Sequence, residues 1–145
     1  MTQTTTKSQG LTGGTGDTST GSSSDAARTR ARLDDLLNYI QNGRIIEAMN
    51  EFYHADVRMQ ENGNAPTVGL PANIERERQF LAGVKEWKGF SVLAKAASDD
   101  VSFVENRIEF IATSGAPVSM QQVSVARWRD GKIVEERFYY DASAK

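Results

Sequence analysis

The sequence predicts an α+β domain in which three N-terminal helices pack on one face of a curved, mainly antiparallel sheet. Apolar residues repeat at helical spacing in the first half of the chain, and strand-like runs fill the second half. The last two runs are joined by Arg129-Asp130-Gly131, and Asp-Gly between two such runs is a strong signal for a tight hairpin. Helices that precede a hairpin-linked set of strands favour this fold class over alternating strands and helices.

The chain has 145 residues, and its first 24 differ in composition from the rest. Residues 1–24 consist almost wholly of Thr, Ser, Gly and Gln, which offer little apolar surface to offset the entropy of ordering. We therefore expect a disordered tail over residues 1–24 and one domain over residues 25–145. A phosphorylated or partner-binding tail is the alternative to a dispensable one.

Two helices are expected at the start of the domain. Ser24-Asp25 can cap a helix that begins at Ala26, and Asn42-Gly43 can end it in a left-handed conformation. A shorter helix should follow at once, so the pair must form a corner or hairpin. The inner faces are predicted to be Leu33, Leu36, Leu37 and Ile40 in the first helix and Ile45, Ala48, Met49 and Phe52 in the second.

A strand over residues 56–61 and a third helix are expected next. Val57, Met59 and Glu61 share one side of the strand, so Glu61 continues an apolar phase in which a solvated carboxylate is not expected. Pro71 suits the first turn of the third helix. Its inner face should be Ile74, Leu81, Val84 and Trp87, and its solvated face Glu75, Arg76, Glu77, Arg78 and Lys85.

Four further strands are predicted at 90–97, 101–113 and in a hairpin over 118–141, with Asp99-Asp100 as turn formers. Alternation places one set of residues on one face of each hairpin strand. These faces mix apolar bulk with a few polar groups, as the wall of a ligand cavity would. They comprise Val118, Met120, Gln122, Ser124, Ala126 and Trp128 in the first strand and Val134, Glu136, Phe138 and Tyr140 in the second.

Composition excludes several classes of function. The net charge is −2 with acids and bases interspersed, so the chain has no basic stripe for nucleic acid. It contains no cysteine, and a single histidine, His54, cannot build a multi-histidine metal site. No apolar run approaches the roughly 20 residues of a membrane span, and no signal peptide is evident. We expect a cytoplasmic protein without membrane attachment, metal or cofactor.

Two segments resemble a known family. The run NEFYHADVRMQENG is similar to the entry of the NTF2-like superfamily, and RWRDGKIVEERFYYD is similar to the last hairpin of its SnoaL-like branch, the polyketide cyclase and ketosteroid isomerase-like proteins. The resemblance covers about residues 28 to 141. It implies a conical α+β barrel with a deep apolar pocket, in a dimer formed by the outer face of the sheet. Val123, Val125, Arg127, Arg137 and Tyr139 would supply that face.

The resemblance also suggests site residues. Glu61 falls where ketosteroid isomerases place their general base, whereas their oxyanion-hole positions hold Leu36 or Leu37 and Ser124 or Gln122 here. In SnoaL-like cyclases an acid stands on the last strand, at the position of Phe138 here, and Glu136 lies two residues earlier. A structural Glu61 that pairs with an arginine at the pocket mouth is the alternative.

We therefore expect a domain that binds a small apolar or carbonyl-containing molecule. If the protein is an enzyme, it is a cofactor-independent isomerase or cyclase that abstracts a proton next to a carbonyl. Glu61 would be the base and Tyr140 a hydrogen-bond donor. Met59, Gln122, Ser124, Trp128, Glu136 and Phe138 would bind the substrate. The alternatives are a non-catalytic ligand-binding or dimerisation module and a protein-interaction adaptor.

Overall fold

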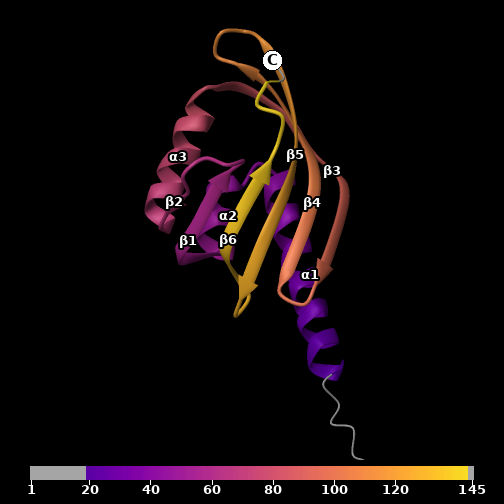
Figure 1. Ribbon diagram of the computed structural model, residues 1–145. Helices are drawn as coiled ribbons and strands as arrows, with labels where there is room; N and C mark the ends of the chain where they lie inside the picture. Colours follow the sequence, from indigo (N-terminus) through magenta and orange to yellow (C-terminus); the bar gives the residue numbers. More distant parts are fainter. Residues whose placement is uncertain (1–18, 144–145) are drawn as a thin grey trace, which may run out of the picture.

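The structure, a computed structural model, describes residues 19–143. Within that range the chain forms three helices and one six-stranded sheet of strand order β2-β1-β6-β5-β4-β3 (Figure 1). The helices are α1 (Ser19–Gln41), α2 (Ile45–Phe52) and α3 (Leu70–Ala82). The strands are β1 (Tyr53–Glu61), β2 (Thr67–Val68), β3 (Val84–Ser98), β4 (Val101–Ala112), β5 (Pro117–Arg129) and β6 (Lys132–Tyr139).

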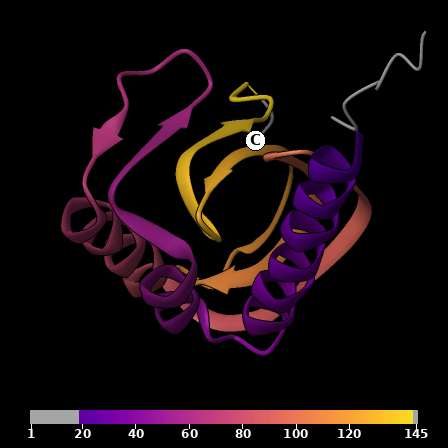
Figure 2. The same cartoon turned by 90° about the horizontal axis from the view of Figure 1, so that it is seen from below.

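The predicted fold class is confirmed. The pairs β3–β4, β4–β5 and β5–β6 are antiparallel, as is β1–β2. The strands β1 and β6 pair in parallel, which places the first long strand of the chain beside the last one. Figure 2 shows that the sheet is strongly curved and that the three helices lie along its concave side. The apolar faces of helices and sheet are thereby turned toward one interior.

The helix boundaries differ from the prediction in two places. Helix α1 begins at Ser19 rather than Ala26, so Ser24 and Asp25 lie within the helix and do not cap it. Helix α3 ends at Ala82, and Gly83 forms its C-cap. Val84 therefore begins β3 opposite Ala112 instead of extending the inner face of the helix, and Trp87 follows in the same strand. Residues 1–18 of the expected tail lie outside the described residues.

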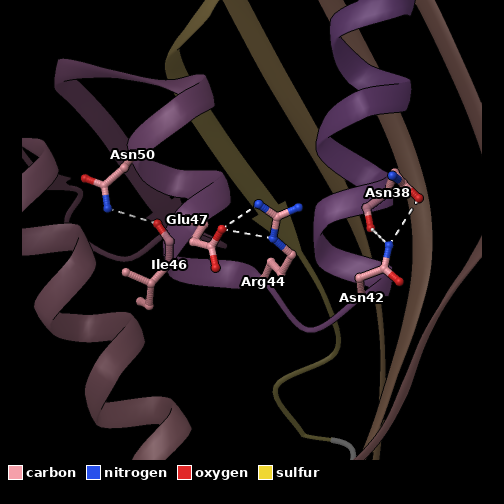
Figure 3. Close-up of polar contacts among 6 residues, drawn as sticks. All are labelled: Asn38, Asn42, Arg44, Ile46, Glu47 and Asn50. Carbon is pink, nitrogen blue, oxygen red and sulfur yellow. Dashed lines mark hydrogen bonds and ion pairs between the residues drawn. The ribbon is translucent and has the colours of Figure 1, made fainter.

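The corner between α1 and α2 forms as the Asn42-Gly43 pair predicts (Figure 3). Gly43 has φ +74°, a left-handed conformation that favours glycine. Asn42 Nδ2 donates to the Asn38 carbonyl at 2.7 Å, and Arg44 donates to Glu47 Oε2 at 2.6 and 2.9 Å. The Arg44 guanidinium also lies 4.2 Å from the centre of the Tyr39 ring. These local contacts hold α2 against the end of α1.

The final hairpin is built on the predicted turn. Asp130 and Gly131 both have positive φ, +52° and +75°, which defines the type I′ geometry that suits the twist of paired strands. A register shift between Arg127 and Trp128 follows immediately. As a result, two residues of β6 that are three positions apart both point into the interior. Ile133, opposite Trp128, is 0% exposed, and Glu136, opposite Ala126, is 4% exposed. The bulge thus changes the phase of β6 near the start of the strand.

The core lies between the helices and the inner face of the sheet. The predicted inner faces of α1 and α2 are buried or half-buried there, and Val57, Val104, Ala126, Trp128 and Ile133 meet them from the strands. None of the described helices is long and apolar enough to cross a membrane. Next to this core, residues of α3 help to line a cavity in the interior.

Candidate active site

A cavity of about 130 Å³ lies between the helices and the inner face of the sheet. Its wall is mainly apolar, and its residues come from all three helices and from every strand except β2. The apolar lining is Leu33, Leu36, Leu37, Ile40, Ile45, Ala48, Met49, Met59, Phe80, Phe90, Val104, Ile108, Ala126 and Phe138, together with the ring of Trp87. The polar groups are those of Tyr53, Glu77, Ser102, Asn106, Gln122, Ser124 and Glu136, and the indole N–H of Trp87.

Glu136 is the central polar group of this cavity. It stands on β6 between Met59 of β1 and Ala126 of β5, and its side chain points inward because of the bulge earlier in the strand. The Tyr53 hydroxyl donates a hydrogen bond to its Oε1, and Ser124 Oγ donates to its Oε2 at 2.8 Å. Both donors are themselves buried. The carboxyl group is thus fixed in orientation by two strands that flank its own.

Burial controls the protonation of this group. Desolvation raises the pKa of Glu136 to about 7, while the hydrogen bonds from Tyr53 and Ser124 oppose that rise and the charge of Glu77 adds to it. Burial, followed by the nearby Glu136 charge, raises the pKa of Tyr53 well above its usual value, so the phenol stays protonated. Near neutral pH the site therefore holds a carboxyl group that can either take up or release a proton.

A second, outer pocket of about 170 Å³ adjoins the cavity. The two share six lining residues, which are Met59, Glu77, Phe80, Ile108, Gln122 and Phe138. Glu77 was predicted on the solvated face of α3, but it is half-buried at this junction because α3 turns it toward the sheet. Burial raises its pKa, and the charge of Glu61 raises it further. Glu136, Glu77 and Glu61 thus follow one another from the cavity to the outer pocket.

The structure places five of the eight predicted site residues around the cavity, namely Met59, Gln122, Ser124, Glu136 and Phe138. Trp128 lies instead in the core at 5% exposure, where its Nε1 donates to Ser102 Oγ at 2.9 Å. That contact satisfies the indole N–H.

The two residues predicted to act on the substrate lie outside the cavity wall. Glu61 lines the outer pocket and accepts a hydrogen bond from Arg76 at 3.0 Å, with its side chain 41% exposed. This is the arginine pairing of the alternative interpretation. Glu61 stands two residues beyond Met59, about 7 Å farther along β1 at the usual rise per residue, which carries it past the cavity. Tyr140 is half-buried beside it, and burial and the Glu61 charge raise the pKa of its phenol.

Sequence reasoning missed Tyr53, Glu77, Trp87 and Asn106 as site residues. Tyr53 follows the last residue of α2, and it was not assigned to the strand that begins there. Asn106 interrupts the apolar phase of Val104 and Ile108 in β4, which is the same signal that drew attention to Glu61. Alternation of polarity within β4 could therefore have found it.

The cavity carries acidic groups without basic ones. No lysine, arginine or histidine is among the described residues that line it, whereas Glu77 and Glu136 are. In the part of the chain that the structure describes, no group of three or more His, Cys, Asp or Glu side chains is placed to hold a metal ion. The arrangement offers a ligand hydrogen-bonding groups and a titratable carboxyl in an otherwise apolar space.

Fold and site together define an NTF2-like α+β protein with an internal cavity, and the family comparison agrees. The model of the SnoaL-like domain matches residues 33–136. The chain belongs to this family of SnoaL-like domains. No curated protein matches it.

Solved structures share the fold at low sequence identity. A candidate SnoaL-like polyketide cyclase from Mesorhizobium loti aligns with 77% of this chain and 97% of its own at 23% identity and a TM-score of 0.65. An NTF2-like protein of unknown function from Burkholderia pseudomallei aligns with 79% of this chain and 91% of its own at 14% identity and a TM-score of 0.69. An LEH-like epoxide hydrolase of M. tuberculosis aligns with 81% of this chain and 85% of its own at 18% identity and a TM-score of 0.66.

Proposed function

We propose that this SnoaL-like domain binds a small carbonyl compound in its cavity and removes a proton from the carbon next to the carbonyl. The proton is then returned to the same or another carbon, and no cofactor takes part. Glu136 is the acid–base group. The observation that carries the proposal is its position, buried in an apolar cavity between two hydrogen-bond donors, with a pKa of about 7. This assignment replaces the sequence-based one, in which Glu61 was the base.

The proposed reaction requires one acid–base group, two residues that orient it and a cavity that excludes water. The ionised Glu136 takes the proton from the carbon, the electron pair moves to the carbonyl oxygen, and the resulting enol or enolate takes a proton back at the same or another carbon. Tyr53 and Ser124 are positioning residues, because their hydrogen bonds hold the carboxylate plane and leave lone pairs on both oxygens free for the substrate. The apolar walls exclude water from the reacting carbon.

Hydrogen exchange tests the proposal without knowledge of the natural substrate. A small cyclic ketone, cyclohex-2-enone or 1-tetralone, is incubated with the protein in D2O, and loss of its exchangeable C–H signals is followed by NMR. The wild-type protein should accelerate exchange, and Glu136→Gln should lower the rate by about 10²-fold or more, as loss of a general base does.

Glu61→Gln is the matched control, since it removes the same charge from the outer pocket. It should exchange nearly as fast as the wild type. Exchange that survives Glu136→Gln and disappears in Glu61→Gln would return the role to Glu61. Exchange no faster than in buffer for every protein would leave a non-catalytic ligand-binding module as the better description.

We also propose that the domain is a homodimer joined through the outer face of the sheet. Phe103, Val123 and Tyr139 are large apolar side chains that are 36–44% exposed on this face. In register, Phe103 stands opposite Val125, and Val123 stands opposite Tyr139. A contiguous exposed apolar patch favours association, and a two-fold symmetric interface would bury the patch of each copy against that of the other.

Native mass spectrometry measures the oligomeric state directly. The wild type should have twice the chain mass, and Val123→Lys, which places a charge at the centre of the patch, should have the mass of one chain. Lys132→Glu, an exposed change at the hairpin, is the control and should remain dimeric. A monomeric wild type at micromolar concentration would refute the dimer.

A further inference from the structure

Neither hydrogen-bond donor to Glu136 can carry its proton out of the cavity. These donors are the Tyr53 phenol and the Ser124 hydroxyl. Burial, followed by the Glu136 charge, raises the pKa of Tyr53 well above its usual value, and a serine hydroxyl does not ionise near neutral pH. A proton that Glu136 takes from a substrate therefore returns to that substrate unless a further group removes it.

Glu77 is placed to exchange this proton with the outside. Among the six described residues that the cavity and the outer pocket share, it is the only one with a titratable side chain. Its charge acts on Glu136 from the outer side, and the charge of Glu61 acts on Glu77 in turn. Glu61 is paired with Arg76 and is 41% exposed. Glu77 thus lies between the buried acid and the solvated mouth of the outer pocket.

Helix α3 turns Glu77 inward because two neighbours on the same face are anchored. Asn73, Glu77 and Phe80 follow one another at intervals of four and three residues, so they share one side of the helix. Asn73 is 3% exposed and donates from Nδ2 to the Thr67 carbonyl of β2 at 3.1 Å. The Phe80 ring meets the edge of Phe110 of β4 at 5.4 Å between centroids. These anchors, one turn before Glu77 and one turn after it, hold its side chain against the sheet.

A polar position lies between the two acids. Asn106 stands opposite Gln122 of β5, one inward-facing position beyond the Ser124 that donates to Glu136. Gln122 lines both the cavity and the outer pocket. Asn106 is 3% exposed, and its Oδ1 has no partner among the described residues, which costs stability. A water molecule that donates to this oxygen and contacts the Gln122 amide would satisfy it. Glu77 acts on Glu136 through its charge and not through a direct hydrogen bond, so such a water would bridge the two carboxyl groups.

We propose that Glu77 carries protons between Glu136 and the outer pocket, through a water molecule bound at Asn106. The protonated Glu136 gives its proton to the water, the water gives one of its own to the Glu77 carboxylate, and Glu77 releases it to solvent. The reverse sequence supplies a solvent proton to Glu136, so atoms and charge balance. This role rests on the proposed function, because it concerns the fate of the proton that Glu136 removes. Glu77 is then a proton-transfer residue that acts through Glu136.

Isomerisation in D2O separates removal of the proton from its exchange. Cyclohex-3-enone is incubated with the protein, and formation of the conjugated cyclohex-2-enone is followed by ultraviolet absorbance. The deuterium content of the product is measured by mass spectrometry at low conversion. Return of the same proton gives a product without deuterium, whereas exchange through Glu77 gives a deuterated one. The wild type should therefore form mainly deuterated product.

Two variants remove the carrier while they keep the length of the side chain. In Glu77→Gln and Glu77→Met, the deuterium content of the product should fall about tenfold or more, since a positioned acid–base group transfers protons far faster than unassisted solvent does. This fall should exceed the change in the rate of isomerisation. Glu75→Gln on the exposed face of α3 is the control and should match the wild type. Asn106→Leu, which removes the acceptor for the water, should also lower the deuterium content.

Rescue by imidazole distinguishes proton transfer from a structural role. Imidazole titrates near neutral pH and is small enough for the outer pocket of about 170 Å³. Added to Glu77→Gln, it should restore deuterium to the product in proportion to its concentration, and it should leave Glu75→Gln unchanged. Failure of this rescue would mean that Glu77 supports the fold of the site and carries no proton.

The outcomes separate this inference from the proposed function. Isomerisation without deuterium in the wild-type product, or with equal deuterium in both Glu77 variants and the wild type, refutes the carrier role and leaves the proposed function standing. Equal loss of isomerisation in Glu77→Gln and Glu136→Gln also refutes it, because Glu77 would then act in proton removal. An unchanged deuterium content in Asn106→Leu refutes the bridging water. If Glu77→Gln does not fold, Glu77→Met decides alone. Neither isomerisation nor exchange by the wild type would refute the proposed function, and the carrier role with it.

Discussion

The Tyr53 hydroxyl donates a hydrogen bond to Glu136 Oε1 inside the cavity, across a separation of 83 residues in the chain. Tyr53 opens β1 and Glu136 lies on β6, and these two strands pair in parallel. The contact therefore depends on the closure of the sheet by its first long strand and its last. It links the fold to the protonation of the site, because loss of this pairing would release the carboxyl group from a donor that stabilises its ionised form.

Glu136 should make the stability of the protein depend on pH. Its pKa is about 7 in the folded state and 4.5 in the unfolded chain, so the folded state holds more protons between these values. Stability contributed by the protonated carboxyl is complete below about pH 4.5 and is lost as the pH rises through 7. The free energy of unfolding should fall by about 3 kcal/mol across this interval, because the folded state binds the proton more tightly than the unfolded chain does.

Urea unfolding at about pH 5 and about pH 8 measures this dependence. Glu136→Gln should remove most of the difference between the two pH values, and the comparison within each protein cancels effects of the substitution that do not depend on pH. Glu135→Gln, the exposed neighbour on the same strand, is the control and should keep the wild-type difference. A Glu136→Gln profile as steep as that of the wild type would contradict the assignment.

Tyr53→Phe should move the titration of Glu136 to higher pH. The hydrogen bond from Tyr53 lowers the pKa of Glu136 against the larger effect of burial, so its removal leaves desolvation less opposed. The ketone exchange rate should fall near neutral pH and recover at higher pH, rather than fall equally at all pH values. Ser124→Ala should shift the profile in the same direction, because Ser124 donates to the other carboxyl oxygen. A shift toward lower pH would be inconsistent with this arrangement.

Glu77→Gln should act in the opposite direction. The negative charge of Glu77 raises the pKa of Glu136, so its removal should lower the pH at which exchange reaches half of its maximum. Burial also raises the pKa of Glu77 itself, hence the variant should be more stable than the wild type above neutral pH. Glu75→Gln on the exposed face of α3 provides the comparison. Equal profiles for Glu75→Gln and Glu77→Gln would exclude coupling between the two acids.

Patterns within single elements predicted most of the fold. Apolar spacing located the buried faces of α1 and α2, and Asp130-Gly131 located the hairpin, because both signals depend on residues close together in the chain. The parallel pairing of β1 with β6 could not be predicted in this way, since it joins segments far apart in sequence. Tyr53 was missed for the same reason: its role appears only when β6 lies beside it.

The site shows the limit of reasoning from alternation. Glu61 has the predicted phase with Val57 and Met59, but phase alone does not say how far along a strand the cavity extends. Glu136 was assigned to the cavity face, yet Ile133, in the opposite phase, is also buried because a bulge intervenes. Glu77 has the pattern of a solvated helix face, and only the packing of α3 against the sheet turns it inward.

Gly131→Ala should destabilise the fold, because this residue has φ +75° in the hairpin that positions β6. A side chain in the left-handed region costs about 1 to 2 kcal/mol, and the added Cβ would lie 3.6 Å from Arg32 Nε, an ordinary contact. The penalty should therefore come from the backbone and appear as a lower urea midpoint with an unchanged slope. Gly63→Ala is the control, since nothing lies within 4 Å of its added Cβ and its φ is not positive. Equal midpoints for the two variants would show that the turn tolerates alanine and does not depend on glycine.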